Sequence, residues 1–118
     1  MITVFLVFMK VLKVNDVKGV NLGNIAIRKT LVYSDNMMMH AEAKPGGPPI
    51  AHSHPHEQMG YVLQGKVELE AGGKTVALEA GSSYYIEPNE YHVIRDAGST
   101  ENIIILDIFH PARDEYKP

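Results

Sequence analysis

Turn-forming residues interrupt this sequence so often that no long helix fits between them. Short apolar blocks rich in Val, Ile, Tyr and Leu alternate with segments such as NLGN, KPGGPP, AGGK and EPNE. No stretch of about 12 residues keeps the apolar period of an α-helix free of these breakers. The sequence therefore predicts an all-β protein.

The expected strands are short and follow one another closely. Their ranges are 3–14, 25–33, 37–43, 50–54, 58–64, 66–70, 74–78, 83–87, 91–95 and 102–109. Glycines in LQGKV and EAGGKT favour tight turns, and therefore antiparallel pairing. With 118 residues the chain suits one domain, over residues 1–118, and short strands without covering helices favour a double-sheet jelly roll.

The apolar opening MITVFLVFM lacks the alternation of an edge strand. Val4 to Met9 is apolar on both faces of the expected strand, whereas an edge strand normally shows water one polar face. The segment is too short to span a bilayer, and no basic residue precedes it as in a signal peptide. We expect a homodimer through this N-terminal strand, although a start at Met9 would also open a sensible strand.

The composition limits the metal ligands and partners that the chain can use. It has no cysteine, so disulfides, thiolate nucleophiles and thiolate metal ligands are excluded. The net charge is -3, with acidic and basic residues mixed, so nucleic acid is not an expected partner. We expect no membrane association and a cytoplasmic location.

Half of the six histidines lie within five positions, in the segment HSHPHEQ. Residues two apart in a strand point to the same side, so His52 and His54 can bind one ion. A proline follows and ends the regular alternation, so the direction of His56 stays open. Gln58 begins the next strand, on the side that returns to the interior, and His92 opens a later strand after the turn EPNE.

The order of these residues resembles the two motifs of the cupin family. The first is a glycine, five residues, His-x-His, three or four residues, Glu, six residues and Gly; it is matched from Gly46 to Gly65, with Gln58 replacing Glu. The second is a glycine, five residues, Pro-x-Gly, two residues and His; it is matched from Gly81 to His92, with EPN replacing Pro-x-Gly. The resemblance implies a cupin double-stranded β-helix, largely antiparallel, that binds a divalent transition metal such as Zn, Ni, Fe or Mn. The ligands that it implies are His52, His54, Gln58 and His92.

Replacing the motif glutamate with Gln58 affects the charge of such a metal. Three neutral imidazoles and a neutral amide leave a divalent ion its full +2 charge, which makes it a stronger Lewis acid. Glu57 could be the missing carboxylate, but strand alternation points it away from the interior. His56 is expected at the rim of the pocket.

The last expected strand places a charged residue inside the apolar run IIILDIF. Alternation puts Asp107 on the same face as Ile105 and Phe109, where it could act as a general base if that face lines the barrel. An aspartate bonded to backbone groups is an equal alternative. Arg113 follows within a turn and could bind a carboxylate bidentately, although an arginine in a polar tail is more often exposed.

The segments HSHPHEQ and LDIFHPARDEY resemble the pectin-degradation cupins, which open the ring of unsaturated uronates to linear keto sugars. The resemblance implies a metal-dependent isomerase or ring-opening enzyme that acts on a small sugar acid, with Asp107, Phe109 and Arg113 as catalytic residues. The chain departs from that family by one fewer residue between His54 and Gln58. An iron-dependent dioxygenase of a small molecule, and a non-catalytic metal-dependent sugar-binding protein, therefore stay as alternatives.

Overall fold

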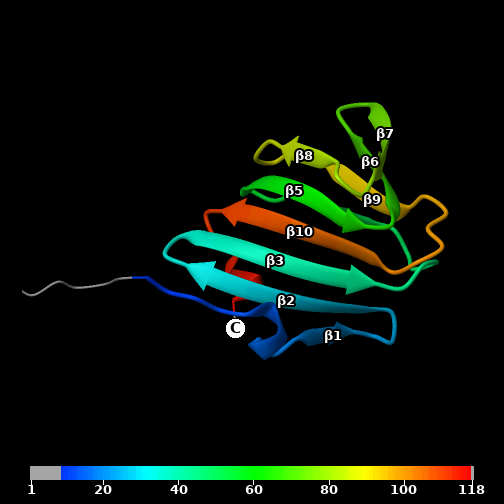
Figure 1. The fold of residues 1–118 in the computed structure, drawn as a ribbon. Helices are drawn as coiled ribbons and strands as arrows, with labels where there is room; N and C mark the ends of the chain where they lie inside the picture. Colours follow the sequence, from blue (N-terminus) through cyan, green and yellow to red (C-terminus); the bar gives the residue numbers. More distant parts are fainter. Residues whose placement is uncertain (1–8, 118) are drawn as a thin grey trace, which may run out of the picture.

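The computed structural model describes residues 9–117 and folds them into two antiparallel sheets (Figure 1). The strands are β1 (Val20–Leu22), β2 (Ala26–Tyr33), β3 (Asn36–Ala43), β4 (Ile50–His52), β5 (Glu57–Gln64), β6 (Lys66–Ala71), β7 (Lys74–Glu79), β8 (Ser83–Ile86), β9 (His92–Asp96) and β10 (Ile103–His110). Within the described residues the helices are the 3-10 turns η1 (Val14–Asp16) and η2 (Asp114–Tyr116). Neither is long or apolar enough to cross a bilayer.

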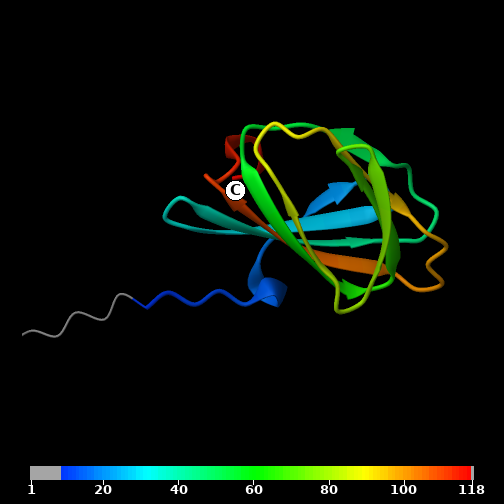
Figure 2. The same cartoon turned by 90° about the horizontal axis from the view of Figure 1, so that it is seen from above.

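The two sheets face each other around a common interior, as the turned view shows (Figure 2). One sheet has six strands in the order β1-β2-β3-β10-β5-β8, and the other has four in the order β4-β9-β6-β7. The last strand, β10, therefore lies between β3 and β5, far from it in sequence. This crossover order brings residues from both halves of the chain to one cavity.

Strict alternation in the central strands decides which side chains face that cavity. In β5 the residues from Gln58 to Val62 alternate between buried and exposed, with Gln58, Gly60 and Val62 buried. In β10 the buried residues are Ile103, Ile105, Asp107 and Phe109. The expected inward directions of Gln58 and Asp107 are confirmed. A buried cluster of Val62, Val67, Ile103 and Ile105 fills one end of the barrel.

Nine of the expected strands form, whereas the expected strand over 3–14 is wrong where the structure describes it. Residues 9–13 form no strand, and Val14–Asp16 form a 3-10 turn. The first half of NLGN instead lies in β1 and its second half begins the turn of the β1–β2 hairpin, in which Val20 pairs with Arg28. Strand β1 therefore occupies the edge of β2 that a longer N-terminal strand would need. Residues 1–8, on which the homodimer prediction depends, lie outside the described residues.

Gly60 leaves room for an aromatic side chain from the neighbouring strand. It pairs with Tyr84 across β5 and β8, and a Cβ built on Gly60 would overlap the Tyr84 ring. Replacing Gly60 with alanine should push this ring outward and lower the free energy of unfolding by about 1–3 kcal/mol. Urea denaturation of both proteins measures this difference.

Gly47→Ala is a matched control. A Cβ on Gly47 would have its nearest neighbour, a side-chain methyl of Ile25, at 3.4 Å, which is ordinary contact. We expect this variant to stay within about 0.5 kcal/mol of the parent protein. Equal stability of Gly60→Ala and Gly47→Ala would contradict the close packing of Tyr84 on Gly60.

Candidate metal centre

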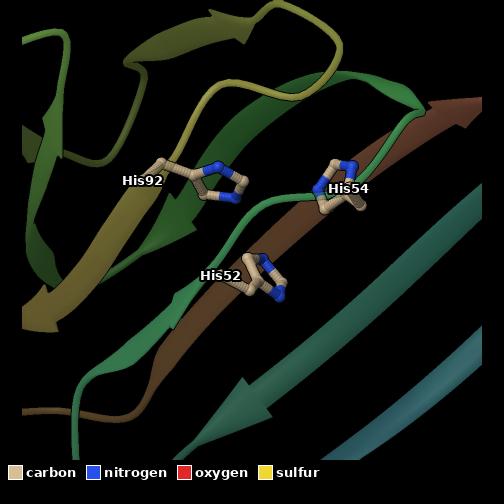
Figure 3. A group of neighbouring side chains, drawn as sticks. All are labelled: His52, His54 and His92. Carbon is tan, nitrogen blue, oxygen red and sulfur yellow. The ribbon is translucent and has the colours of Figure 1, made fainter.

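Three histidines meet at one end of the barrel. His52 ends β4, His54 follows two residues later, and His92 begins β9, so their rings point toward one shared space (Figure 3). His52 and His92 are direct partners in the β4–β9 pairing. One ligand atom of each ring lies within 4.8 Å of the others. This spacing could hold one metal ion among three imidazoles.

His54 is held by hydrogen bonds rather than by a strand ladder. The expected strand over 50–54 ends at His52, because the proline at position 55 cannot donate to a ladder. The backbone N–H of Asn89 donates to the carbonyl of His54 at 2.7 Å. Asn89, in the turn EPNE, adopts the left-handed conformation, with φ of 66°. The turn before β9 thus fixes His54 close to His92.

Two carbonyl groups determine which ring nitrogen faces the site. Nδ1 of His54 lies 3.0 Å from the carbonyl oxygen of His56, and Nδ1 of His92 lies 2.8 Å from that of Glu90. Since a carbonyl only accepts, each Nδ1 must carry hydrogen, and in a neutral ring Nε2 then keeps its lone pair. Nε2 of His92 is buried and has no hydrogen-bond partner within residues 9–117. A buried acceptor of this kind is suited to binding a cation.

Gln58 turns its amide oxygen toward the same space. Its Nε2 donates to Asp107 Oδ1 at 3.0 Å, so its Oε1 faces the histidines, 3.0 Å from Nε2 of His54. Tyr84 donates its hydroxyl to the same Asp107 oxygen at 2.5 Å. With the His56 carbonyl bonded to Nδ1 of His54, two acceptor atoms face each other at hydrogen-bond distance. Two acceptor atoms this close repel each other unless a cation lies between them. That cation is either a proton on Nε2 of His54 or a metal ion.

The electrostatic surroundings disfavour the proton. Burial, together with the nearby positive charges of His92 and Arg113, lowers the pKa of His52 to about 4. Burial also lowers the pKa of His54, and the positive charge of Arg113 adds to this. At neutral pH these imidazoles are therefore neutral and available as ligands, and the donor set fits a divalent ion.

Asp107 is a buried carboxyl group with side-chain partners. Burial raises its pKa, although hydrogen bonds from Tyr84 and Gln58 act in the opposite direction. The pKa of Tyr84 is raised by burial and by the nearby Asp107, so Tyr84 stays a hydroxyl donor. The side-chain partners of Asp107 are thus a tyrosine and the amide of Gln58, and its carboxyl group lines the cavity.

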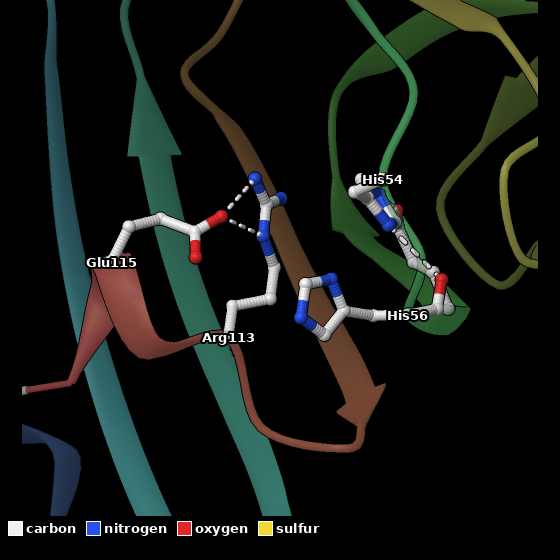
Figure 4. Close-up of polar contacts among 5 residues, drawn as sticks. His54, His56, Arg113 and Glu115 are labelled. Atoms are coloured by element: carbon white, nitrogen blue, oxygen red, sulfur yellow. Dashed lines mark hydrogen bonds and ion pairs between the residues drawn. The ribbon is translucent and has the colours of Figure 1, made fainter.

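Arg113 and Phe109 lie beside the histidines. Arg113 is 6% exposed, and its Nε and Nη2 donate to one carboxylate oxygen of Glu115 at 2.8 and 2.7 Å (Figure 4). Its Nη1 is buried without a partner among the described residues. The Phe109 ring lies 5.5 Å from the His54 ring and 5.1 Å from Arg113 Cζ. Both side chains line the cavity that contains Asp107.

Glu57 and His56, whose part in metal binding the sequence leaves open, lie outside this cluster of histidines. Glu57 is half-buried and points away from the cavity, where its carboxylate lies 3.4 Å from the hydroxyl of Tyr85. His56 is half-buried and lies beside Arg113 in Figure 4. The position of Glu57 agrees with the sequence expectation.

The sequence did not single out Tyr84, which donates to Asp107, or Arg28, which lines the cavity. Gly60, a glycine inside a strand, is a signal for a large ring on the adjacent strand. The sequence contains no comparable signal for Arg28. The buried residue of its strand is Leu31, and side-chain alternation along the strand puts Leu31 and Arg28 on opposite faces.

The chain is similar to proteins of one family along most of its length. The family described as Cupin domain matches residues 39–109. The Pectin degradation protein KdgF of Dickeya dadantii (strain 3937) is 31% identical over 98 residues, which cover 80% of this chain and 86% of that protein.

Two solved structures share the fold. An RmlC-like cupin from Shewanella frigidimarina NCIMB 400 superposes with a TM-score of 0.77 at 24% identity, over 87% of this chain and 91% of that one. KdgF from Halomonas sp. superposes with a TM-score of 0.77 at 24% identity, over 87% of this chain and 95% of that one. The expected antiparallel jelly-roll barrel is confirmed.

Metal content provides a test of the histidine cluster. Protein purified without chelator or a nickel column should contain about one divalent ion per chain, and His92→Ala should lose most of it. The control is His110→Ala, because His110 is exposed and bonded to Asn36. Elemental analysis by mass spectrometry measures the content. Undiminished metal in His92→Ala would contradict the site.

The depressed pKa of His52 predicts the acid limit of metal binding. Protons and metal compete for the same lone pair, so a lower pKa weakens the proton as a competitor. With the pKa at about 4, the ion should be retained at about pH 6 and released as the pH approaches 4. Dialysis at a series of pH values, followed by metal analysis, measures this. Complete loss of the metal ion at about pH 6 would contradict this prediction.

Proposed function

The chain belongs to the cupin family and is a relative of the pectin degradation protein KdgF, and on this basis we propose that it opens the ring of an unsaturated uronate to the linear keto form. The observation that carries this proposal is the connection between Asp107 and the histidines through Gln58. A proton carrier and a candidate metal centre thus share one cavity.

We assign a divalent ion to the three imidazoles and to the amide oxygen of Gln58. The two facing acceptors, Gln58 Oε1 and His54 Nε2, support this assignment, as does the unpartnered Nε2 of His92. A divalent ion bound by neutral ligands would polarise a substrate oxygen as a Lewis acid. The proposed ligands are His52, His54, Gln58 and His92.

Asp107 is proposed to move the proton. When its carboxylate takes the proton of the anomeric hydroxyl, a carbonyl forms there and the ring carbon–oxygen bond breaks. The ring oxygen leaves as an enolate, whose neighbouring carbon takes the proton back from Asp107 to give the ketone. The reaction is an isomerisation, so no atom or electron is gained or lost. A pKa raised by burial makes Asp107 a better base than an exposed carboxylate.

Arg113 is proposed to hold the substrate carboxylate. Glu115 fixes the guanidinium by bonding Nε and Nη2, which leaves the buried Nη1–H free to donate. Phe109 packs between the His54 ring and this guanidinium and so keeps both in position. The carboxylate would thus be held beside the histidines, with the substrate ring next to Asp107.

Asp107→Asn separates catalysis from binding. The variant should retain metal, and its turnover of the unsaturated uronate should fall by about 100-fold or more because the proton carrier is gone. Loss of the ultraviolet absorbance of the substrate's conjugated double bond measures turnover. Asp114→Asn, at an exposed aspartate near the same end of the barrel, is the control and should be fully active.

Other outcomes of this experiment would contradict the proposal. Unchanged turnover in Asp107→Asn would remove Asp107 from catalysis. Metal-loaded parent protein that binds the uronate but never converts it would favour a binding protein instead. Oxygen uptake with iron but not with zinc would favour the dioxygenase alternative.

A further inference from the structure

Two arginines from opposite ends of the chain lie against one aromatic ring. Cζ of Arg28, in β2, is 4.0 Å from the centroid of the Tyr116 ring, and Cζ of Arg113 is 4.1 Å from it. The two guanidinium groups are therefore close to each other, because both contact the same ring. All three side chains line the cavity that also contains His52 and Asp107.

The surrounding chain holds this arrangement in place. Arg28 is paired with Ala41 on β3, and the small side chains of Ala26 and Ala43 line the cavity beside them, so a long side chain has room to extend inward. The hydroxyl of Thr30 donates to the backbone carbonyl of Tyr116 at 2.8 Å. This bond ties the C-terminal 3-10 turn to β2. A tyrosine ring in contact with both guanidiniums also stabilises their positive charges.

Arg28 differs from Arg113 in having no carboxylate partner within residues 9–117. Its Nε is buried without a hydrogen-bond partner among these residues, and so is Nη1 of Arg113. Orphaned buried donors are rare in folded proteins, because each loses its bond to water without a replacement. Two such donors from neighbouring guanidiniums in one cavity point to an anionic ligand.

The other charged groups that line the cavity either have partners or are exposed to water. Arg95 has a glutamate partner at 3.6 Å. Asp96 accepts backbone N–H groups, and Asp107 accepts from side chains. Lys44 is exposed to water. Arg28 is therefore the uncompensated and partly buried cation among the described residues of this cavity.

We propose that Arg28 is a second anion-binding residue that, together with Arg113, selects acidic sugars over neutral ones. The unpartnered donors of the two guanidiniums would bind carboxylate oxygens, with Arg28 supplying the charge that no residue of the chain neutralises. The inference deepens the proposed function and rests on it for the reaction, whereas the binding of the anion needs no turnover.

Calorimetric titration of the zinc-loaded protein tests this directly. The probes are galacturonate, a saturated uronate without the double bond that the reaction consumes, and galactose, its neutral counterpart. The parent protein should bind galacturonate more tightly than galactose. Arg28→Gln should weaken galacturonate binding about tenfold or more and leave galactose binding unchanged. Arg95→Gln, at an arginine of the same cavity that already has a partner, should stay within about twofold of the parent.

Arg28→Lys keeps the positive charge and separates binding from folding. It should recover part of the lost galacturonate affinity, and a thermal melt identifies any variant that fails to fold. Galacturonate binding by folded Arg28→Gln that equals the parent would overturn the inference. So would a parent protein that does not prefer galacturonate to galactose. If galacturonate binds through Arg28 but the unsaturated uronate is not converted, the anion site stands and the proposed reaction fails.

Discussion

The hydrogen bond from the Gln58 amide nitrogen to Asp107 determines the orientation of the whole candidate centre. A carboxylate can only accept, so it fixes which end of the amide faces it and turns the amide oxygen toward His54. Carbonyl groups fix His54 and His92 in the same way, by accepting the hydrogen of Nδ1. Lone pairs from separate segments of the chain then face one shared space, an arrangement that a divalent cation can stabilise and that hydrogen bonds alone do not satisfy.

The barrel makes this arrangement available because β10 lies between strands that are distant in sequence. Register brings Asp107 opposite Gly60 and Phe109 opposite Gln58, so the proposed proton carrier, the proposed metal ligand and an aromatic side chain are adjacent on one sheet. Gly60 in turn admits the ring of Tyr84, whose hydroxyl completes the bonding of Asp107. Farther along the same sheet, β2 and the adjoining C-terminal turn contribute the positively charged side chains of Arg28 and Arg113 to the cavity.

Much of this was predictable from the sequence, and the exceptions have physical causes. Period-two alternation predicts the inward directions of Gln58 and Asp107 that the structure has, and the spacing of two motifs indicates the cupin fold. The expected strand over 3–14 is wrong within its described part, residues 9–14, because apolar composition does not reveal which sheet edge is free, and β1 occupies that edge. The role of Arg28 is not predictable from the sequence, because it depends on contact with the C-terminal turn, and no local pattern encodes a contact between opposite ends of the chain.

A crystal structure of the zinc-loaded protein with anomalous scattering data is the most direct test of the central claim. The account predicts one ion bound by imidazole nitrogens of His52, His54 and His92 at about 2.1 Å, with the amide oxygen of Gln58 at about the same distance and its nitrogen still bonded to Asp107. An ion at another position, or an ion here with the Gln58 amide turned away from it, would contradict the account.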